Sequence, residues 1–128
     1  LVLYKRISNA ETEDQLRELK VEMIDRFGLL PEPVKNLFRV TTLKLHAENL
    51  GIKKLDAGER GGKIEFNQET TIDPGSIVKL VQSEPHRYKL ATANQLIFDD
   101  KMEQIDTRFT KVELLLERLN NKRVNIAS

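Results

Sequence analysis

Apolar residues recur every three or four positions along several stretches of the chain, and this spacing is typical of amphipathic helices. The clearest stretch carries one apolar stripe, formed by Leu16, Leu19, Met23 and Phe27. Thr12 and, three positions later, Gln15 match a capping box at its beginning, and Gly28 matches a C-terminal stop. We therefore expect a helix between Thr12 and Gly28 whose stripe, Phe27 included, is buried.

The same spacing predicts four more helices. They are expected over residues 1–8, from the Pro31–Pro33 segment to about Leu50, from Pro74 to just before Pro85, and from about Lys101 to Asn121. Asp73 is placed to cap the fourth helix of the chain, and the Asp99–Asp100 pair to cap the last one. The residues that follow this long C-terminal helix are expected to fray.

Between these helices the hydrophobic pattern changes to a period of two, which is typical of strands. Strands are expected at residues 52–55 and 63–66, and again at 88–90 and 95–98. In the first hairpin, the loop is expected to obtain its positive φ angles from Gly58, Gly61 and Gly62. Two hairpins that pair into one antiparallel sheet, packed with several helices, predict an α+β fold and a single domain over residues 1–128.

Composition limits the class of protein. Of the 128 residues, 39% are hydrophobic and 32% are charged, and the net charge is +1. These values argue against a disordered chain, a membrane protein and a global basic field for nucleic acid. The chain has no cysteine, which excludes disulfides, thiolate metal sites and cysteine nucleophiles. No signal peptide is visible, so we expect a cytoplasmic protein with no membrane partner. The first residue is Leu1, not Met, so we expect a fragment of a larger multidomain protein.

Motifs for catalysis are missing from the sequence. The six glycines form neither a dinucleotide-binding fingerprint nor a phosphate loop, and no serine lies in a nucleophile elbow. His46 and His86 are forty positions apart, whereas a metal site needs about three or four converging ligands. We interpret His46 as a helix-surface residue and His86 as a loop residue. The fragment is therefore expected to be no enzyme and to hold no cofactor or metal.

Two charged features remain as candidate binding sites. The first is a basic group around the first hairpin, formed by Lys53, Lys54, Arg60 and Lys63. It predicts an accessory nucleic-acid-binding role, although only Phe66 supplies an aromatic ring nearby. The alternative is a solvated hairpin edge that lysines protect from pairing with other strands, and the residues alone favour this alternative.

The second feature, the acidic ridge, comprises Asp14, Glu18, Glu22 and Asp25. At about 100° per residue these four carboxylates fall on one side of their helix, opposite the apolar stripe. Residues 11–26 have a net charge of −3. A ridge of this kind can bind a basic partner, or it can be an ordinary solvated helix face. From the residues alone, the solvated face is the favoured interpretation.

Four sequence blocks stand out by their order and spacing: LYKRI (3–7), VEMIDRFGLLPEPV (21–34), LGIKKL (50–55) and GGKIEF (61–66). Together they resemble the C-terminal domain of the bacterial transcription-repair coupling factors, the Mfd family. The resemblance implies that the parent is an ATP-dependent double-stranded-DNA translocase whose motor uses ATP and Mg²⁺. It also implies that the parent acts on stalled RNA polymerase and recruits the protein UvrA in transcription-coupled nucleotide excision repair after DNA damage.

The resemblance implies a regulatory role for this domain rather than a motor role. The domain is expected to fold back on the UvrA-binding module of the same chain and to mask it, which is autoinhibition. The masking contact is implied to use acidic residues of the helix that carries the IDRFG motif, and these match Glu22 and Asp25 here. Both belong to the acidic ridge, so the resemblance favours an interaction surface over a solvated face.

Overall fold

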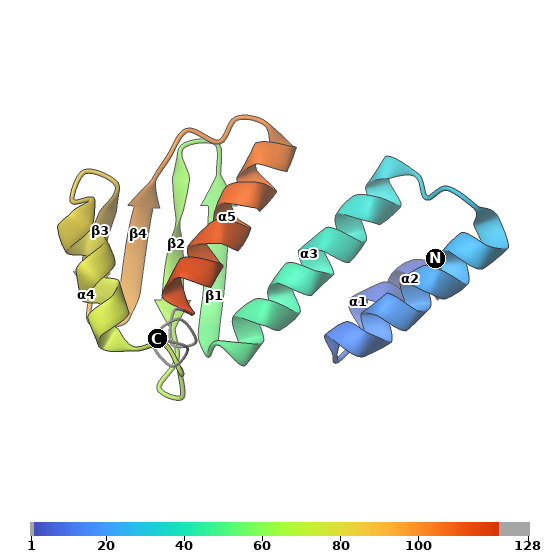
Figure 1. The fold of residues 1–128 in the computed structure, drawn as a ribbon, viewed down its shortest axis with the longest axis horizontal. Helices are drawn as coiled ribbons and strands as arrows, with labels where there is room; N and C mark the ends of the chain where they lie inside the picture. The colour runs from blue at the N-terminus through green and yellow to red at the C-terminus, as the bar shows by residue number, and fades with distance from the viewer. Residues whose placement is uncertain (1, 121–128) are drawn as a thin grey trace, which may run out of the picture. The chain divides into compact units, whose positions relative to one another are not determined.

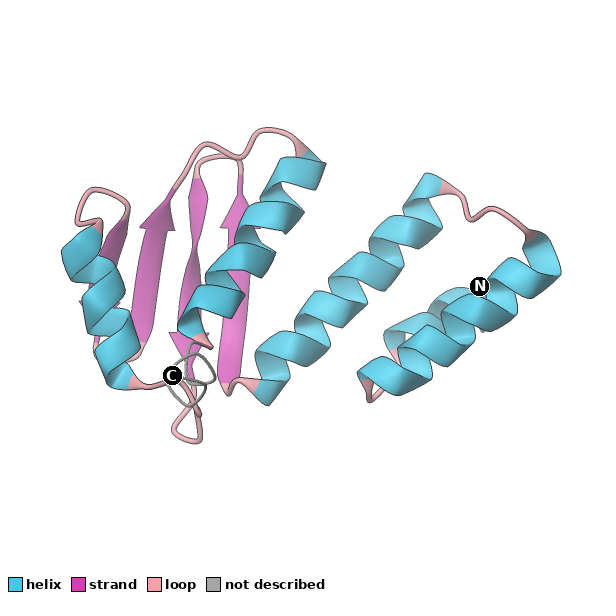
Figure 2. Ribbon diagram, in the orientation of Figure 1, coloured by secondary structure: helices cyan, strands magenta, loops and turns pink. Residues whose placement is uncertain are grey.

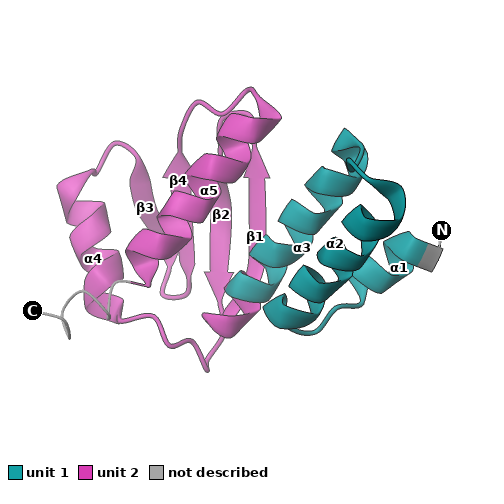
Figure 3. Cartoon of the chain, turned by 45° about the vertical axis from the view of Figure 1, so that its right-hand side comes forward, with its two compact units in different colours: residues 1–46 teal, residues 47–128 magenta. Residues whose placement is uncertain are grey.

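A computed structural model describes residues 2–120 and divides the chain into two compact units, residues 1–46 and residues 47–128 (Figure 3). The first unit is helical, and the second contains a four-stranded antiparallel sheet (Figure 2). With five helices in the described residues, the chain has the predicted α+β fold. The single domain expected over residues 1–128 stays a prediction. The fraying expected at the C-terminus concerns residues 121–128, which lie outside the described part.

The helical unit contains α1 (Val2–Ser8), α2 (Glu13–Phe27) and most of α3 (Glu32–Asn49), all three of which were predicted (Figure 1). Thr12 caps α2, because its hydroxyl oxygen accepts a 3.1 Å hydrogen bond from the backbone N–H of Gln15. The core of this unit is a cluster of buried apolar side chains: Ile7, Leu16, Leu19, Met23, Leu30, Val34, Phe38 and Leu45. The apolar stripe of α2 therefore packs as expected through Met23.

The prediction that Phe27 belongs to this core is wrong. Its side chain is 61% exposed. The helix ends at Phe27, and Gly28 turns the chain with a φ of +77°, while its N–H donates to the carbonyl of Ile24. After this turn Leu30 is buried in the core cluster. The core cluster therefore continues beyond the helix stop with Leu30, and not through Phe27.

The second unit contains the sheet, built from β1 (Ile52–Gly58), β2 (Gly61–Phe66), β3 (Tyr88–Thr92) and β4 (Gln95–Asp99). Both hairpins were predicted, and they pair through β2 and β4, which gives the order β1-β2-β4-β3. Cross-strand partners share a face of the sheet, and one row joins Leu55, Ile64, Leu96 and Leu90. Helices α4 (Pro74–Ser83) and α5 (Ile105–Leu119) lie on one side of the sheet (Figure 1). The unit is thus a layer of helices on one antiparallel sheet.

The first hairpin is tighter than predicted. Its strands run to Gly58 and from Gly61, so only Glu59 and Arg60 connect them. Of the three glycines expected to have positive φ angles, only Gly61 does, at +138°. The expectation for Gly58 and Gly62 is wrong because both residues continue the strands as extended partners.

The last helix begins later than predicted, at Ile105 instead of Lys101. The backbone N–H of Asp100 donates to the carbonyl of Arg60, and that of Met102 donates to the carbonyl of Glu59. These bonds hold the chain against the first hairpin in a non-helical conformation. The predicted capping by the Asp99–Asp100 pair is therefore wrong: Asp99 ends β4, and the cap position is Gln104.

Candidate interaction surface

The acidic ridge lies along α2, the helix that Thr12 and Gly28 delimit. Asp14, Glu18 and Asp25 are exposed, and Glu22 is half-buried. The regular helix from Glu13 to Phe27 carries all four carboxylates, so the predicted alignment on the side opposite Leu16, Leu19 and Met23 follows from the helix geometry. Whether these four residues bind a partner stays a prediction.

Two of the four ridge carboxylates already have cationic partners within the helical unit. Glu22 forms a 2.9 Å ion pair with Arg6 of α1, and Asp14 forms one of 2.9 Å with Arg17 on its own helix. Glu18 and Asp25 have no ion pair among residues 2–120. The ridge therefore offers two carboxylates that have no cationic partner in the described part of the chain. One of them, Asp25, belongs to the IDRFG motif.

A surface hollow of about 430 Å³ lies between α1 and α2 beside the ridge. It is lined by Arg6, Asn9, Ala10, Gln15, Glu18, Leu19 and Glu22. Glu22 is held by Arg6, whereas the carboxylate of Glu18 at this hollow has no ion pair among residues 2–120. Such an arrangement can accept a cationic side chain of another protein surface.

The fold places two of the four basic residues of the first hairpin on neighbouring strands, where carboxylates lie opposite them. Lys54 and Lys63 lie on neighbouring strands, but their cross-strand partners are the carboxylates Glu65 and Asp56. Lys54 also forms a 3.8 Å ion pair with Asp56. Alternating charges of this kind weaken the local positive potential on which nucleic-acid binding depends. The role of these lysines, and of Lys53 and Arg60, in binding nucleic acid stays a prediction.

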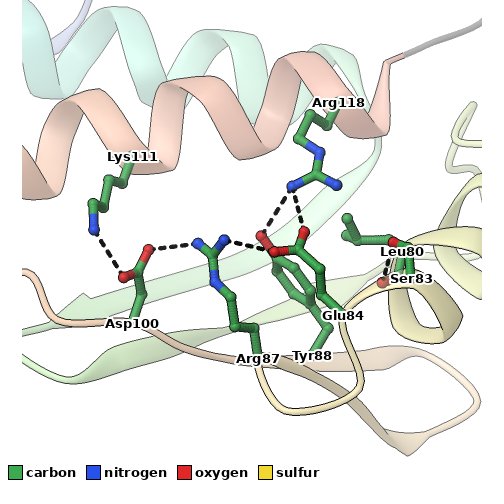
Figure 4. Close-up of polar contacts among 8 residues, drawn as sticks. All are labelled: Leu80, Ser83, Glu84, Arg87, Tyr88, Asp100, Lys111 and Arg118. Carbon is green, nitrogen blue, oxygen red and sulfur yellow. Dashed lines mark hydrogen bonds and ion pairs between the residues drawn. The ribbon is translucent and has the colours of Figure 1, made fainter.

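The structure adds a charged cluster that the sequence did not reveal, at the end of α4, the second hairpin and α5 (Figure 4). Asp100 accepts hydrogen bonds from Arg87 at 2.7 Å and from Lys111 at 2.8 Å. Glu84 accepts from Arg87 at 2.8 Å and from Arg118 at 2.9 Å. Only the Glu84–Arg87 spacing of three residues was visible in the sequence, because the other pairs join segments far apart along the chain.

These contacts shift the titration of both carboxylates. Partial burial alone would raise the pKa of Asp100, but the ion pairs with Lys111 and Arg87 outweigh it and hold this pKa below its ordinary value. Hydrogen bonds from Arg118 and Arg87 lower the pKa of Glu84. Both arginines also lie over the ring of Tyr88, at 5.4 and 5.8 Å from its centroid. We interpret the cluster as a structural device that ties α5 to the second hairpin.

The described residues show no metal-binding constellation. Within residues 2–120, no group of three or more histidine, cysteine, aspartate or glutamate side chains is arranged to hold a metal ion. His46 is half-buried on α3 and His86 is exposed in a loop. The same part of the chain contains no helix with the length and apolar character of a membrane span.

The chain is therefore an α+β protein with a helical unit and a unit built on an antiparallel sheet. The chain belongs to the TRCF domain family, whose model matches residues 1–77. It is 39% identical over 124 residues to the transcription-repair-coupling factor of Escherichia coli strain K12, and the aligned segment covers 97% of this chain and 11% of that protein. It is 48% identical over 89 residues to the transcription-repair-coupling factor of Haemophilus influenzae, and this alignment covers 70% of this chain and 8% of that protein.

The fold is also found among solved structures. A crystal structure of the C-terminal domain of transcription-repair coupling factor superposes with a TM-score of 0.69 at 20% identity, over 94% of this chain and 81% of that one. The resemblance seen in the four sequence blocks is therefore confirmed, as is the fold class. The chain spans about a tenth of the length of the two curated relatives, so their names describe much longer proteins.

Proposed function

We propose that this domain is an autoinhibitory clamp within a transcription-repair coupling factor. In this proposal the parent is an ATP-dependent double-stranded-DNA translocase with ATP and Mg²⁺ in its motor, and it acts on stalled RNA polymerase in nucleotide excision repair. The domain itself is no enzyme. It binds the UvrA-binding module of the same chain and thereby keeps UvrA from binding.

The observation that carries the proposal is the acidic ridge on α2. Asp25 and Glu18 are exposed carboxylates without an ion pair in the described residues, and Glu22 lies beside them at a hollow. Their spacing on a capped, regular helix fixes the distance between the charges before a partner binds, which favours charge-assisted pairs with arginines. The membership in the TRCF domain family supports the parent that the proposal requires.

Weak contacts are sufficient for such a clamp. An exposed ion pair contributes only about 0–1 kcal/mol, but a tether between two modules supplies an effective concentration in the millimolar range. With about 1 mM effective concentration and a Kd of about 10 µM for the separate modules, the closed state outnumbers the open one by about 100 to 1. Differential binding worth a few kcal/mol, from polymerase and DNA, is then enough to open the clamp.

Charge reversal in the full-length parent tests the proposal. Asp25→Lys is the sharper variant, because Glu22→Lys would also place a second cation beside Arg6. Asp25→Lys is expected to raise the affinity for UvrA at least several-fold, while Glu117→Lys, an exposed reversal on α5, leaves it unchanged. Unchanged UvrA affinity in Asp25→Lys and in the Glu22→Lys/Asp25→Lys double variant would refute the clamp.

The same proteins test the nucleic-acid alternative. If the basic hairpin binds DNA, then replacing Lys54 and Lys63 by glutamine is expected to weaken duplex binding by the parent and to reduce its salt dependence. The proposal predicts instead that this double variant binds duplex DNA as the wild type does, because the motor supplies that binding.

A further inference from the structure

Beside the acidic ridge, α2 and the residues after it expose a row of apolar side chains. Val21 is 56% exposed, Ile24 44%, Phe27 61% and Leu29 94%. We call these four residues the apolar row. The first three are spaced by three positions and are therefore successive neighbours on the helix surface. Single exposed apolar side chains are common, but contiguous ones mark surfaces that bind other molecules.

The apolar row lies beside the acidic ridge on α2. Val21 lies three residues after Glu18 and four residues before Asp25, so both carboxylates are its neighbours on the surface of α2. None of the four apolar side chains belongs to the buried core cluster of the unit. The C-terminal half of α2 therefore presents an apolar strip with a charged rim: Glu18 and Asp25 flank Val21, and the exposed cations Arg17 and Lys20 lie one turn before Val21 and Ile24.

We propose that the apolar row is the centre of the clamp contact and that the acidic ridge is its rim, an inference that rests on the proposed function. Its occupant is a surface of the UvrA-binding module in which apolar side chains lie next to arginine or lysine. Charge complementarity supports this occupant, because Glu18 and Asp25 lack an ion pair among residues 2–120 and lie at the edge of the row. Rim charges give orientation and partner choice, whereas desolvated apolar and aromatic side chains supply most of the affinity.

The two parts of the contact differ in their response to salt. At about 1 M ionic strength the screening length is about 3 Å, so exposed ion pairs lose most of their attraction while apolar contacts are retained or strengthened. The proposal therefore predicts that the wild-type parent keeps UvrA affinity low when salt is raised. A clamp held by the ridge alone would open under the same conditions.

The test compares paired variants of the full-length parent at moderate and high salt. Val21→Gln/Ile24→Gln is expected to raise UvrA affinity about tenfold and to make closure sensitive to salt. The matched control, Val78→Gln/Leu114→Gln, replaces two similarly exposed side chains on α4 and α5 and is expected to leave UvrA affinity unchanged. Leu29→Gln is a second variant, outside the helix, whose 94% exposure makes an effect on folding small.

The outcomes separate this inference from the proposed function. If Asp25→Lys raises UvrA affinity and neither Val21→Gln/Ile24→Gln nor Leu29→Gln does, the apolar centre is refuted and the clamp stands. If no variant of ridge or row has an effect, both proposals fail. An equal rise in the Val78→Gln/Leu114→Gln control would also overturn the inference, because the effect would then not depend on α2.

Discussion

Met23 and Phe27 lie one turn apart on α2, yet their environments are opposite. Met23 is 5% exposed and belongs to the buried cluster of the helical unit, whereas Phe27 is 61% exposed at the helix end. Replacing each by alanine keeps good helix formers on α2 and removes only the side chain beyond Cβ. The pair of variants therefore compares a buried and an exposed apolar side chain on one helix.

The expected magnitudes follow from burial. Truncation of a buried methionine costs about 2–5 kcal/mol, because transfer free energy is lost and a cavity remains. Full burial of a phenylalanine side chain contributes about 1.5–3 kcal/mol, and Phe27 buries only about two fifths of its surface. Phe27→Ala is therefore expected to lower the free energy of unfolding by about 1 kcal/mol or less, and Met23→Ala by at least about 2 kcal/mol.

Urea denaturation of this 128-residue chain, followed by circular dichroism, measures both values from the shift of the transition midpoint. Thr12→Ala is a useful companion, since loss of its cap bond to Gln15 is expected to cost about 1 kcal/mol and calibrates the sensitivity of α2. A loss in Phe27→Ala as large as that in Met23→Ala would refute the reasoning, because Phe27 would then be a core residue.

Two further predictions concern the sheet unit. Asp100→Asn is expected to lower the free energy of unfolding by about 1–2 kcal/mol at pH 7, where the more exposed Asp56→Asn changes it by less than about 0.5 kcal/mol. The folded protein lowers the pKa values of Asp100 and Glu84 from their ordinary values of 3.8 and 4.5, so the unfolded chain binds more protons in acid. The free energy of unfolding is therefore expected to decrease as the pH is lowered below about 4.5, and to decrease less in Asp100→Asn. Urea titrations at several pH values measure this dependence. Gly61→Ala should cost about 1–3 kcal/mol in thermal unfolding, because its φ is +138° and a Cβ would clash with the carbonyl oxygen of Phe98. Gly58→Ala should be nearly neutral, because its Cβ would make only an ordinary van der Waals contact, 3.9 Å from the carbonyl oxygen of Gly61.

The sequence predicted most of the fold because local patterns determine most of its elements. Alternation around Ile64 identified the first hairpin, and Thr12 and Gly28 delimited α2. One error, at Asp100, arises because a distant part of the chain overrides a local signal. Asp100 has the spacing of a helix cap, but the hydrogen bond from its backbone N–H to the first hairpin holds it outside the helix, and its carboxylate binds Arg87 and Lys111. No local pattern contains that information.

The candidate site was also predictable only where the signal is local. Helix periodicity is sufficient to place four carboxylates on one side of α2, but it does not reveal that Arg6, on another helix, forms an ion pair with Glu22. Nor does it distinguish a buried apolar position from an exposed one in the last turn. Phe27 continues the stripe by its spacing, yet the turn at Gly28 lets Leu30 fill the core instead.

The pairing of charges separates those that stabilise the fold from those available to a partner. In the sheet unit, Asp100 and Glu84 each contact two cations, and both pKa values are lowered as a result. On the ridge, Glu18 and Asp25 have no ion pair among residues 2–120, and Asp25 borders exposed Val21. Removing Asp100 should therefore change stability, whereas reversing Asp25 should leave stability nearly unchanged and alter only binding. If reversing a ridge residue unfolded the chain, that residue would belong to the charges that stabilise the fold, and the clamp would lose its main support.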